Sequence, residues 1–409
     1  MTILEINNYF YLRGGAERAF FASIAALEAR GHRVIPFALA GAKNRPSPWS
    51  RYFPAPAARR RGWKRLYNRD VARCLERLIQ ETKPDVAHIH NIAYQLTPAV
   101  IAVLRRHNIP MVQTLHDYQA VSPLPLLYSN GAIAQTRAWG SWIGVVLTRA
   151  VKHSLMASAA AVLHTTLDRL FGWTAGVSRF IAPSLFMANM AVGYGLPEDH
   201  IRVLAQPQPV HGCSKRARRH PYFLFVGRLS EEKGVLELIR WWKTLPSSHR
   251  LVIVGDGPLT AAVRRSVRAL SGSRATLYGA CEDRAALARL YEGATAVLVP
   301  SQWYENAPYV VLEAFSHGTP VIASDIGGIP ELVGDDRGWR VEHAASLGWS
   351  WAVARAALYP NEVHERGQRA REWLAHEHTP TAYAQRLEAV LGEACACVRT
   401  PQWCTAELA

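Results

Sequence analysis

Short hydrophobic runs alternate with amphipathic stretches along most of the 409-residue chain. Residues 2–7 predict a strand, and the apolar-periodic stretch 16–30 predicts a helix that Gly31 can end. The same alternation recurs, with strands expected at 33–39, 85–90, 110–115 and 179–182 and a helix at 98–106. Strands that alternate with helices indicate an α/β protein with a doubly wound, mostly parallel sheet.

A basic, proline-containing stretch at 206–220 interrupts this alternation and is typical of a linker. Beyond it the pattern resumes, with strands expected at 222–226, 251–254, 275–278, 296–299 and 320–323 and helices at 235–243 and 308–317. We therefore predict two Rossmann-like domains that face each other across a cleft, with ligands held by the loops after the strands. The expected parts are a first domain at 1–205, a linker at 206–220, a second domain at 221–378 and a tail at 379–409 whose helix can pack back on the first domain.

The strongest chemical signal lies where the strand expected at 296–299 leads through a loop into a helix. Glu305 lies in that loop, and Glu313 follows eight positions later. Asn306 is expected to cap the helix, Pro308 to lie in its first turn and Gly318 to end it. Free N–H groups at such a helix start attract hydroxyl and phosphate oxygens. Two glutamates so far apart suit the binding of two sets of sugar hydroxyls, although this spacing also occurs in ordinary surface helices.

A second loop between a strand and a helix, residues 226–234, carries Arg228 and Lys233. Both cations can converge on one diphosphate at a helix N-terminus. There they would stabilise the negative charge that grows as a nucleoside diphosphate departs. Taken alone, such a pair is more often solvated surface charge, so the functional interpretation depends on the glutamate-containing loop.

The net charge of +15 is concentrated in the first half of the chain. Residues 1–220 hold 28 Lys and Arg against 11 Asp and Glu, a net +17, whereas residues 221–409 hold 19 against 21, a net −2. The segment 59–69 interleaves arginines and Lys64 with Trp63, Leu66 and Tyr67. This charge predicts an anionic partner: a membrane surface, a phosphorylated acceptor or nucleic acid. A solvated loop and helix face explains the segment nearly as well.

The start of the chain lacks the basic and apolar regions of a signal peptide, and the apolar region 142–162 is interrupted by Arg149, Lys152 and His153. A cytoplasmic protein is therefore expected, one that can dock on the inner face of the plasma membrane. The six cysteines lack the paired spacing of a metal site, and no metal is expected. The apolar stretch 139–147 can form either a membrane-facing edge or a buried helix.

Several segments together resemble the family 4 retaining glycosyltransferases, which have the GT-B fold of two Rossmann-like domains. The resemblance runs over most of the chain, and the segments together are far more specific than any one alone. They are residues 12–18, 114–117, 180–184, 227–234, 255–258, 305–314 and 318–324. The resemblance implies transfer of a hexosyl-type sugar from a nucleotide diphosphate sugar to a lipid-linked or glycan acceptor. It also implies a front-face mechanism without metal or other cofactor, typical of the synthesis of cell-surface polysaccharide or glycolipid.

The resemblance further implies roles for individual residues of this chain. Glu313 would bind the nucleotide ribose, and Glu305 would hold the donor sugar together with Asn306, Ala307 and Pro308. Arg228 and Lys233 would hold the diphosphate, the Gly14 and Gly15 backbone would approach it, and His116 would contact the donor sugar.

Other classes of protein fit the sequence less well. A nicotinamide dehydrogenase would need a Gly-x-Gly-x-x-Gly turn, which neither Gly14-Gly15 nor Gly255-Asp256-Gly257 provides. A nucleotide-sugar epimerase can share the GT-B architecture. A basic nucleic-acid-binding protein would explain the charge but not the acidic second half, so no nucleic-acid partner is expected. An inactive homologue is disfavoured by the presence of Arg228, Lys233, Glu305 and Glu313 together.

Overall fold

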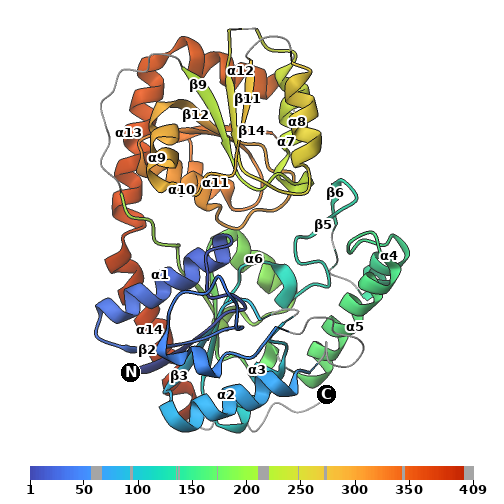
Figure 1. Cartoon of the computed structure of the whole chain (residues 1–409), viewed down its shortest axis with the longest axis vertical. Coiled ribbons are helices and arrows are strands. Elements are labelled where there is room, and N and C mark those ends of the chain that lie inside the picture. The colour runs from blue at the N-terminus through green and yellow to red at the C-terminus, as the bar shows by residue number, and fades with distance from the viewer. Residues whose placement is uncertain are drawn as a thin grey trace. The chain divides into compact units, whose positions relative to one another are not determined.

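The protein is described by a computed structural model that covers most of the chain. It describes residues 1–56, 67–92, 95–134, 136, 139–172, 174–210, 221–246, 248–270, 274–342 and 346–399. The described chain forms two compact units (Figure 1). Unit 1 comprises Met1–Pro125, Thr136–Pro207 and the end of the chain from Pro380, and unit 2 comprises Leu126–Gln135 and Gln208–Thr379. The segment Leu126–Gln135, which the sequence placed in the first domain, thus groups with the second unit.

Unit 1 is built on a six-stranded sheet in the order β2-β1-β3-β4-β7-β8, and every strand pair is parallel. The register between β1 and β3 places Glu5 beside His88 and Ile6 beside Ile89. The strands are β1 (Thr2–Ile6), β2 (Arg33–Phe37), β3 (Val86–Ile89), β4 (Met111–Thr114), β7 (Arg179–Ala182) and β8 (Ile201–Val203).

Alternating strand residues build a separate apolar core on each face of this sheet, since successive side chains point to opposite faces. Leu4 and Ile6 pack with helices α2 (Arg69–Thr82) and α3 (Ala99–Arg106). Ile3 packs instead with α1 (Gly15–Ala29) and α14 (Pro380–Arg399). Unit 1 also contains α4 (Trp139–Leu147), α5 (Leu155–Phe171) and α6 (Leu185–Gly193).

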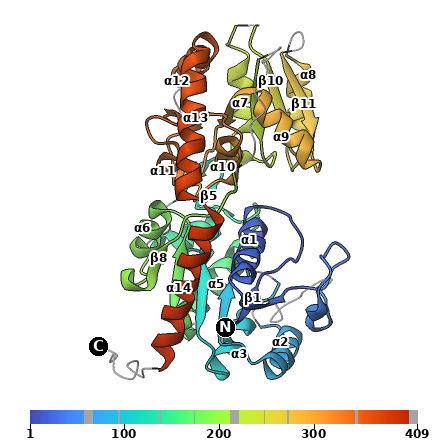
Figure 2. The ribbon, with the colours of Figure 1, turned by 90° about the vertical axis from the view of Figure 1, so that its left-hand side faces the viewer.

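Helix α14 joins the end of the chain to unit 1, where it lies along α1 (Figure 2). The Tyr383 and Ser23 hydroxyls lie 2.8 Å apart in the buried interface. Arg30 pairs with Glu388 at the surface, and Glu393 accepts from both Arg179 and Arg202 at the sheet. These contacts span at least 190 positions of sequence, so the last helix is an integral layer of unit 1.

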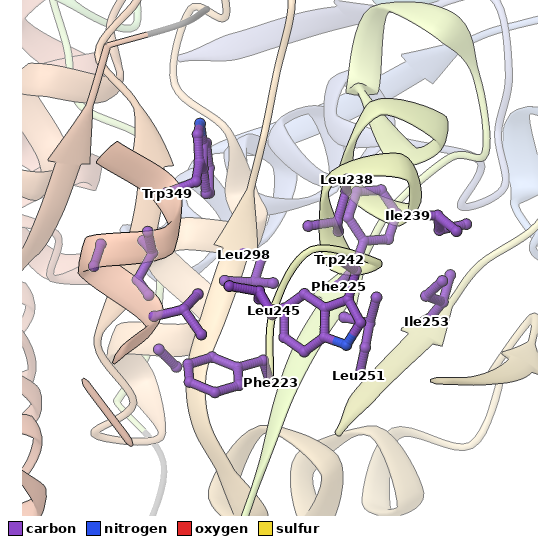
Figure 3. Close-up of a cluster of buried hydrophobic side chains, with 14 of the residues drawn as sticks. Phe223, Phe225, Leu238, Ile239, Trp242, Leu245, Leu251, Ile253, Leu298 and Trp349 are labelled. Carbon is purple, nitrogen blue, oxygen red and sulfur yellow. The ribbon is translucent and has the colours of Figure 1, made fainter. Parts of the chain in front are cut away.

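Unit 2 repeats the architecture with the order β11-β10-β9-β12-β13-β14, again all parallel. Its core includes the fully buried Trp242, which packs edge-on against Phe223 (Figure 3). The strands are β9 (Tyr222–Val226), β10 (Leu251–Val254), β11 (Ala275–Gly279), β12 (Ala294–Val299), β13 (Val321–Ser324) and β14 (Gly338–Val341). The helices are α7 (Val235–Trp242), α8 (Thr260–Arg268), α9 (Arg284–Gly293), α10 (Tyr309–Ser316), α11 (Ile329–Val333), α12 (Ser346–Leu358) and α13 (Pro360–Glu377), and a hairpin of β5 (Tyr128–Ser129) and β6 (Ala132–Ile133) completes the unit.

The predicted fold class, two Rossmann-like parallel-sheet domains, is confirmed. The predicted cap of α10 was wrong: the helix begins at Tyr309 with the extended Pro308 as its N-cap residue, not Asn306. The residue before a proline is pushed away from the helical region, which leaves Ala307 outside the helix. Residues 211–220 of the predicted linker and 59–66 of the basic segment lie outside the described residues. None of the helices that the structure describes combines the length and apolarity needed to cross a bilayer.

Candidate functional site

The predicted cations and glutamates of unit 2 lie at the point where the order of its sheet reverses. From β9 the chain builds outward through β10 to β11, then returns to place β12 on the other side of β9. In open parallel sheets, ligands bind beyond the carboxyl ends of the strands at such a switch point. Lys233 follows β9 and the loop with Glu305 follows β12, so the fold brings these distant segments together.

Lys233 and Glu305 form a direct ion pair. The lysine Nζ lies 2.5 Å from Glu305 Oε1 and 5.3 Å from the centre of the Trp303 ring. Ser301 Oγ donates to the same carboxylate oxygen over 2.7 Å. Glu305 is only 5% exposed, so its charge is held by these partners rather than by solvent. The structure therefore joins two residues that the sequence assigned to different parts of a ligand.

The two loops also meet through their backbones. The Gln302 N–H donates to the Glu232 carbonyl over 2.8 Å. Gly234 has φ +69°, and a Cβ at this position would lie 2.0 Å from the Pro300 carbonyl oxygen. Only glycine allows both this backbone conformation and this close approach. The packing holds the lysine at the end of one loop against the glutamate at the end of the other.

The other two predicted charged residues of unit 2, Arg228 and Glu313, lie in environments that differ from that of the ion pair. Arg228 is exposed on the loop after β9. Glu313 is half-buried on α10 and accepts a hydrogen bond from the Tyr291 hydroxyl over 2.7 Å. Tyr291 in turn stacks on His317, with ring planes 6° apart. Glu313 is thus oriented by a buried tyrosine that the sequence analysis missed.

In unit 1, His116 is part of a buried chain of hydrogen bonds at the carboxyl ends of β1, β3 and β4. Glu5 Oε1 lies 2.8 Å from His88 Nδ1, and Glu5 Oε2 lies 3.0 Å from His90 Nε2. His90 Nδ1 then lies 2.9 Å from His116 Nε2. Glu5, His88 and His90 offer a donor set that could hold a metal ion, and in the structure the same atoms hydrogen-bond to one another.

The charge states of these hydrogen-bonded residues determine which atoms donate and which accept. Burial opposes the ionisation of Glu5, but the electrostatic effect and hydrogen bonds of His88 and His90 outweigh it and lower the pKa of Glu5 to about 2. Burial lowers the pKa of His90 to about 4 and the pKa of His116 well below its usual value. Ionised Glu5 can only accept, so neutral His90 donates from Nε2 and accepts at Nδ1 from His116. The lone pair of His116 is consequently on Nδ1.

This network makes unit 1 sensitive to acid. His90 has a folded pKa of about 4 against an ordinary 6.5, so the unfolded chain binds the extra proton first as pH falls between these values. The free energy of unfolding should therefore fall by about 2 kcal/mol from His90 between pH 7.5 and 4.5. Glu5 lowers the free energy of unfolding further below pH 4.5, because its carboxylate is protonated more readily in the unfolded chain. Urea titrations read by hydrogen exchange of peptides covering β1 and β3 would measure this, with His90→Gln as the control that should flatten the profile. An equal dependence of the free energy of unfolding on pH in wild type and in His90→Gln would contradict the lowered pKa of His90.

A cavity of about 80 Å³ opens beside this network within unit 1. Its polar lining includes His116 and Asp117, which follow β4, and His164 and Asp168 of α5. Burial raises the pKa of Asp117 to about 6 and also raises the pKa of Asp168. Carboxyl groups with raised pKa values beside a neutral histidine are typical of sites that bind or exchange protons with hydroxyl groups. Asp168 and His164 were not identified from the sequence, because a helical pattern gives no sign of which face a cavity touches.

Gly14 and Gly15 lie at the start of α1, after β1. Gly14 is the N-cap residue with an extended backbone, and Gly15 is the first residue of the helix. Glu17 lies in the same first turn and is 6% exposed. Burial raises its pKa, against hydrogen bonds from Asn7 and from the backbone of Glu17 and Gly14. The two glycines therefore lie at a helix N-terminus, the place expected for a backbone that approaches an anion.

Comparison with known families agrees with this arrangement of two units. Residues 13–206 match the model "Glycosyltransferase Family 4", and residues 214–373 match "Glycosyl transferases group 1". Together these matches span most of both units. The chain belongs to the family 4 glycosyltransferases. The resemblance inferred from the sequence is thus confirmed.

Two curated relatives show how far sequence similarity extends. The putative teichuronic acid biosynthesis glycosyltransferase TuaC of Bacillus subtilis is 28% identical over 302 residues, which is 72% of this chain and 67% of that protein. A glycogen synthase of Mycobacterium tuberculosis is also 28% identical over 302 residues, 72% of this chain and 65% of its own length. The chain thus spans about two thirds of the length of these relatives.

Solved structures show the same fold. A sucrose-phosphate synthase from Thermosynechococcus elongatus superposes with a TM-score of 0.73 over 97% of this chain and 99% of its own, at 19% identity. HepE of Anabaena, solved in complex with UDP-glucose, has a TM-score of 0.68 over 96% of this chain and 99% of its own, at 18% identity. At these identities the likeness shows the GT-B fold alone.

Proposed function

We propose that the protein is a retaining, metal-independent glycosyltransferase. It transfers a hexosyl-type sugar from a nucleotide diphosphate sugar to a lipid-linked or glycan acceptor at an anionic membrane surface. The observation that supports this most directly is the Lys233–Glu305 pair at the switch point of unit 2. A cation for a departing diphosphate and a carboxylate for sugar hydroxyls lie within one hydrogen bond of each other there.

The proposed roles follow from the chemistry of each group. Lys233 and the exposed Arg228 bind the diphosphate and stabilise it as it departs, when its negative charge is largest. Glu305, with Asn306, Ala307 and Pro308, holds the donor sugar. In a front-face reaction the bond from the anomeric carbon to the phosphate oxygen breaks while the acceptor oxygen bonds to that carbon from the same side. The acceptor proton passes to the departing phosphate, so the chain needs no carboxylate nucleophile.

For unit 1 we propose the donor contacts that the family resemblance implies. Gly14 and Gly15 contact the diphosphate through their backbone, and His116 contacts the donor sugar. The Glu5–His90 chain supports the second role, because it fixes His116 as neutral with a hydrogen-bond acceptor at Nδ1. Such a histidine accepts from a sugar hydroxyl without adding positive charge beside the anomeric carbon.

Donor hydrolysis tests this proposal. Purified protein should release nucleoside diphosphate from one member of a panel of UDP-, GDP- and ADP-sugars. UDP-glucose comes first, because HepE was solved with it. Activity should persist in EDTA, and the product should keep the anomeric configuration of the donor when followed by NMR. Restoration of an EDTA-inhibited enzyme by Mg²⁺ or Mn²⁺ would refute metal independence. An epimerised sugar formed without acceptor would establish the epimerase alternative.

Glu313 provides a separate test of donor binding. Loss of a hydrogen bond to a charged acceptor costs about 1.5–3 kcal/mol, so Glu313→Ala should raise the dissociation constant for donor by about 10- to 100-fold. Tyr291→Phe removes the hydroxyl that orients Glu313 and should raise it by less than about tenfold. Calorimetry would measure both, with Tyr359→Phe, an exposed tyrosine of the same unit, as the matched control. Unchanged affinity in Glu313→Ala would remove the ribose assignment.

The membrane part of the proposal is supported by the charge of residues 1–220, a net +17. The sequence assigned it in part to Arg59, Arg60, Arg61, Lys64 and Arg65, which lie outside the described residues. A match to a teichuronic acid biosynthesis protein supports a role in the synthesis of cell-surface polysaccharide. Such acceptors reach a cytoplasmic enzyme at the inner face of the plasma membrane.

A further inference from the structure

Helices α4 and α5 pack side by side as a hairpin that leaves several apolar side chains exposed. Within the hairpin, Trp142 and Val145 of α4 are buried, and the Arg169 guanidinium stacks over the Trp142 ring at 4.6 Å. Ser154 caps α5 by accepting from the Ala157 N–H, and Gly172 ends the helix with φ +59°. The hairpin is therefore a defined element with one packed side.

The hairpin also carries large apolar side chains that are exposed to solvent. Of the 18 large hydrophobic residues exposed in the described chain, seven lie within the 29 positions 143–171, far more than an even spread would give. Met156 is 83% exposed and Leu147 and Leu170 are each 72% exposed. These seven are Ile143, Leu147, Leu155, Met156, Leu163, Leu170 and Phe171. On α5 the spacing 156, 163 and 170 places three of them on one stripe of the helix.

The charged residues of the hairpin itself are almost all positive. The turn between the helices exposes Arg149, Lys152 and His153, and Arg169 is exposed near the end of α5. Asp168 is the one acidic residue between 139 and 172, and it lines the cavity and accepts from the Thr174 backbone and hydroxyl. An apolar stripe with cations at its end and no exposed carboxylate complements an anionic phospholipid surface, where apolar side chains enter the interface and cations meet the headgroups. A protein partner would not require that the exposed charges of the hairpin all be positive.

The same helix connects this face to the cavity of unit 1. His164 and Asp168 line the cavity with His116 and Asp117. Successive residues of a helix are about 100° apart, so His164 lies about 100° from Leu163 and Asp168 about 160° from Leu170, on a flank of α5 that is turned away from the apolar stripe. A lipid-linked acceptor with its tail at the apolar stripe would therefore extend its polar head around α5 to reach the cavity.

We propose that the α4–α5 hairpin is the element that docks unit 1 on a membrane rich in anionic phospholipid, with its apolar stripe in the interface and Arg149 and Lys152 at the headgroups. The docking surface itself does not depend on the proposed function. Only the reason for docking, the presentation of a membrane-linked acceptor, rests on it. The proposal assigns the contact to described residues that are separate from the basic segment 59–69.

Vesicle sedimentation of the full-length protein tests the docking surface. Wild type should bind phosphatidylglycerol vesicles at low salt and phosphatidylcholine vesicles much more weakly. Replacing Arg149 and Lys152 by Gln should lower the partition coefficient by about 25-fold and reduce its salt dependence, since each cation near an anionic surface gives roughly a fivefold gain. The triple variant Leu147→Gln, Met156→Gln, Leu170→Gln should lower it at least as much, and Met156→Gln alone should show a smaller loss in the same direction.

The matched control is Leu347→Gln with Leu358→Gln, two leucines of α12 in unit 2 that are 84% and 72% exposed. This control should bind vesicles as wild type does. Equal binding of wild type to neutral and anionic vesicles, or unchanged binding of the triple and charge variants, would overturn the proposal. A triple variant that changes only from dimer to monomer would also overturn it, because the face would then cover a second copy of the chain.

Donor hydrolysis without vesicles separates this inference from the proposed function. The hairpin variants should hydrolyse donor as wild type does, which also shows that they are folded. If no donor is hydrolysed by wild type while docking follows the expected pattern, the proposed function fails and the docking surface stands. If hydrolysis is normal and the variants dock like wild type, the docking surface alone fails.

Discussion

A Lys233→Met variant is expected to lose about 100- to 1000-fold in turnover, the effect of removing one preorganised charge from a transition state. The lysine would meet the diphosphate when its charge is greatest, so the loss should fall mainly on kcat. Removing the ammonium also leaves the carboxylate of Glu305, which is 5% exposed, with the hydrogen bond from the Ser301 hydroxyl but without the ion pair. Lys233→Arg keeps the charge and should recover part of the activity. Steady-state kinetics with the donor identified by hydrolysis would measure all three proteins.

Lys243→Met provides the matched control, because Lys243 is an exposed lysine at the end of α7 in the same unit. Its turnover should stay within about twofold of wild type, as expected for a surface substitution away from a site. A Lys233→Met enzyme with turnover within threefold of wild type would exclude the proposed role for the diphosphate.

The ion pair also predicts that the effects of substituting Lys233 and Glu305 on activity will not be additive. Residues in direct contact couple by about 0.5–3 kcal/mol, whereas distant residues act independently. The double variant Lys233→Met, Glu305→Gln should therefore lose less activity than the product of the single losses. Multiplicative losses would mean that the two side chains separate before the reaction and act on different parts of the donor.

The sequence predicted where the loops with the candidate site residues lie relative to the strands, but not which of their side chains touch. Lys233 and Glu305 were each expected beyond the carboxyl end of a strand, and both lie there. Their contact depends on β12 returning beside β9, and the alternation of strands and helices does not determine that order. The family resemblance implied separate ligand roles for the two residues, and the sequence gives no distance between residues 72 positions apart.

The histidine network escaped the sequence analysis for a related reason. His88 and His90 lie two positions apart in the expected strand at 85–90, so both point to the same face. This spacing was a usable signal, since polar side chains on the buried face of a central strand need partners. Their partner Glu5 lies 83 positions earlier and comes beside His88 only through the register of β1 and β3.

The apolar stretch 139–147 shows a different limit of sequence analysis. A membrane-facing edge and a buried helix were both considered, and the structure shows a helix with one buried and one exposed face. The sequence of α4 is apolar all round, so no polar face indicated which side chains would be exposed. Packing against α5 makes that choice, and the exposed side becomes visible only in the tertiary structure.

Gly255→Ala is expected to prevent unit 2 from folding stably, with a loss of more than about 4 kcal/mol in the free energy of unfolding. Gly255 has φ +142°, a conformation that is essentially restricted to glycine. A Cβ here would lie 1.9 Å from the carbonyl oxygen of Gly227, at the start of the loop that carries Arg228. Two hydrogen bonds prevent that carbonyl from moving away. The Gly227 N–H donates to the Val254 carbonyl and the Leu229 N–H donates to the Asp256 carbonyl, over 3.0 Å each.

Gly279→Ala separates the steric effect from the backbone effect. Gly279 also has a positive φ, +87°, but a Cβ there would have no heavy atom within 4 Å. This control should cost only the strain of the backbone, about 1–3 kcal/mol. Urea unfolding of both variants, read by hydrogen exchange of peptides covering β9 and β10, would compare them within the same unit. If Gly255→Ala proved no more destabilising than Gly279→Ala, the loop after β9 would be able to move away from β10. The Gly255-Asp256-Gly257 segment would then have to be explained by contact with a ligand rather than by the close packing of two loops beneath Arg228.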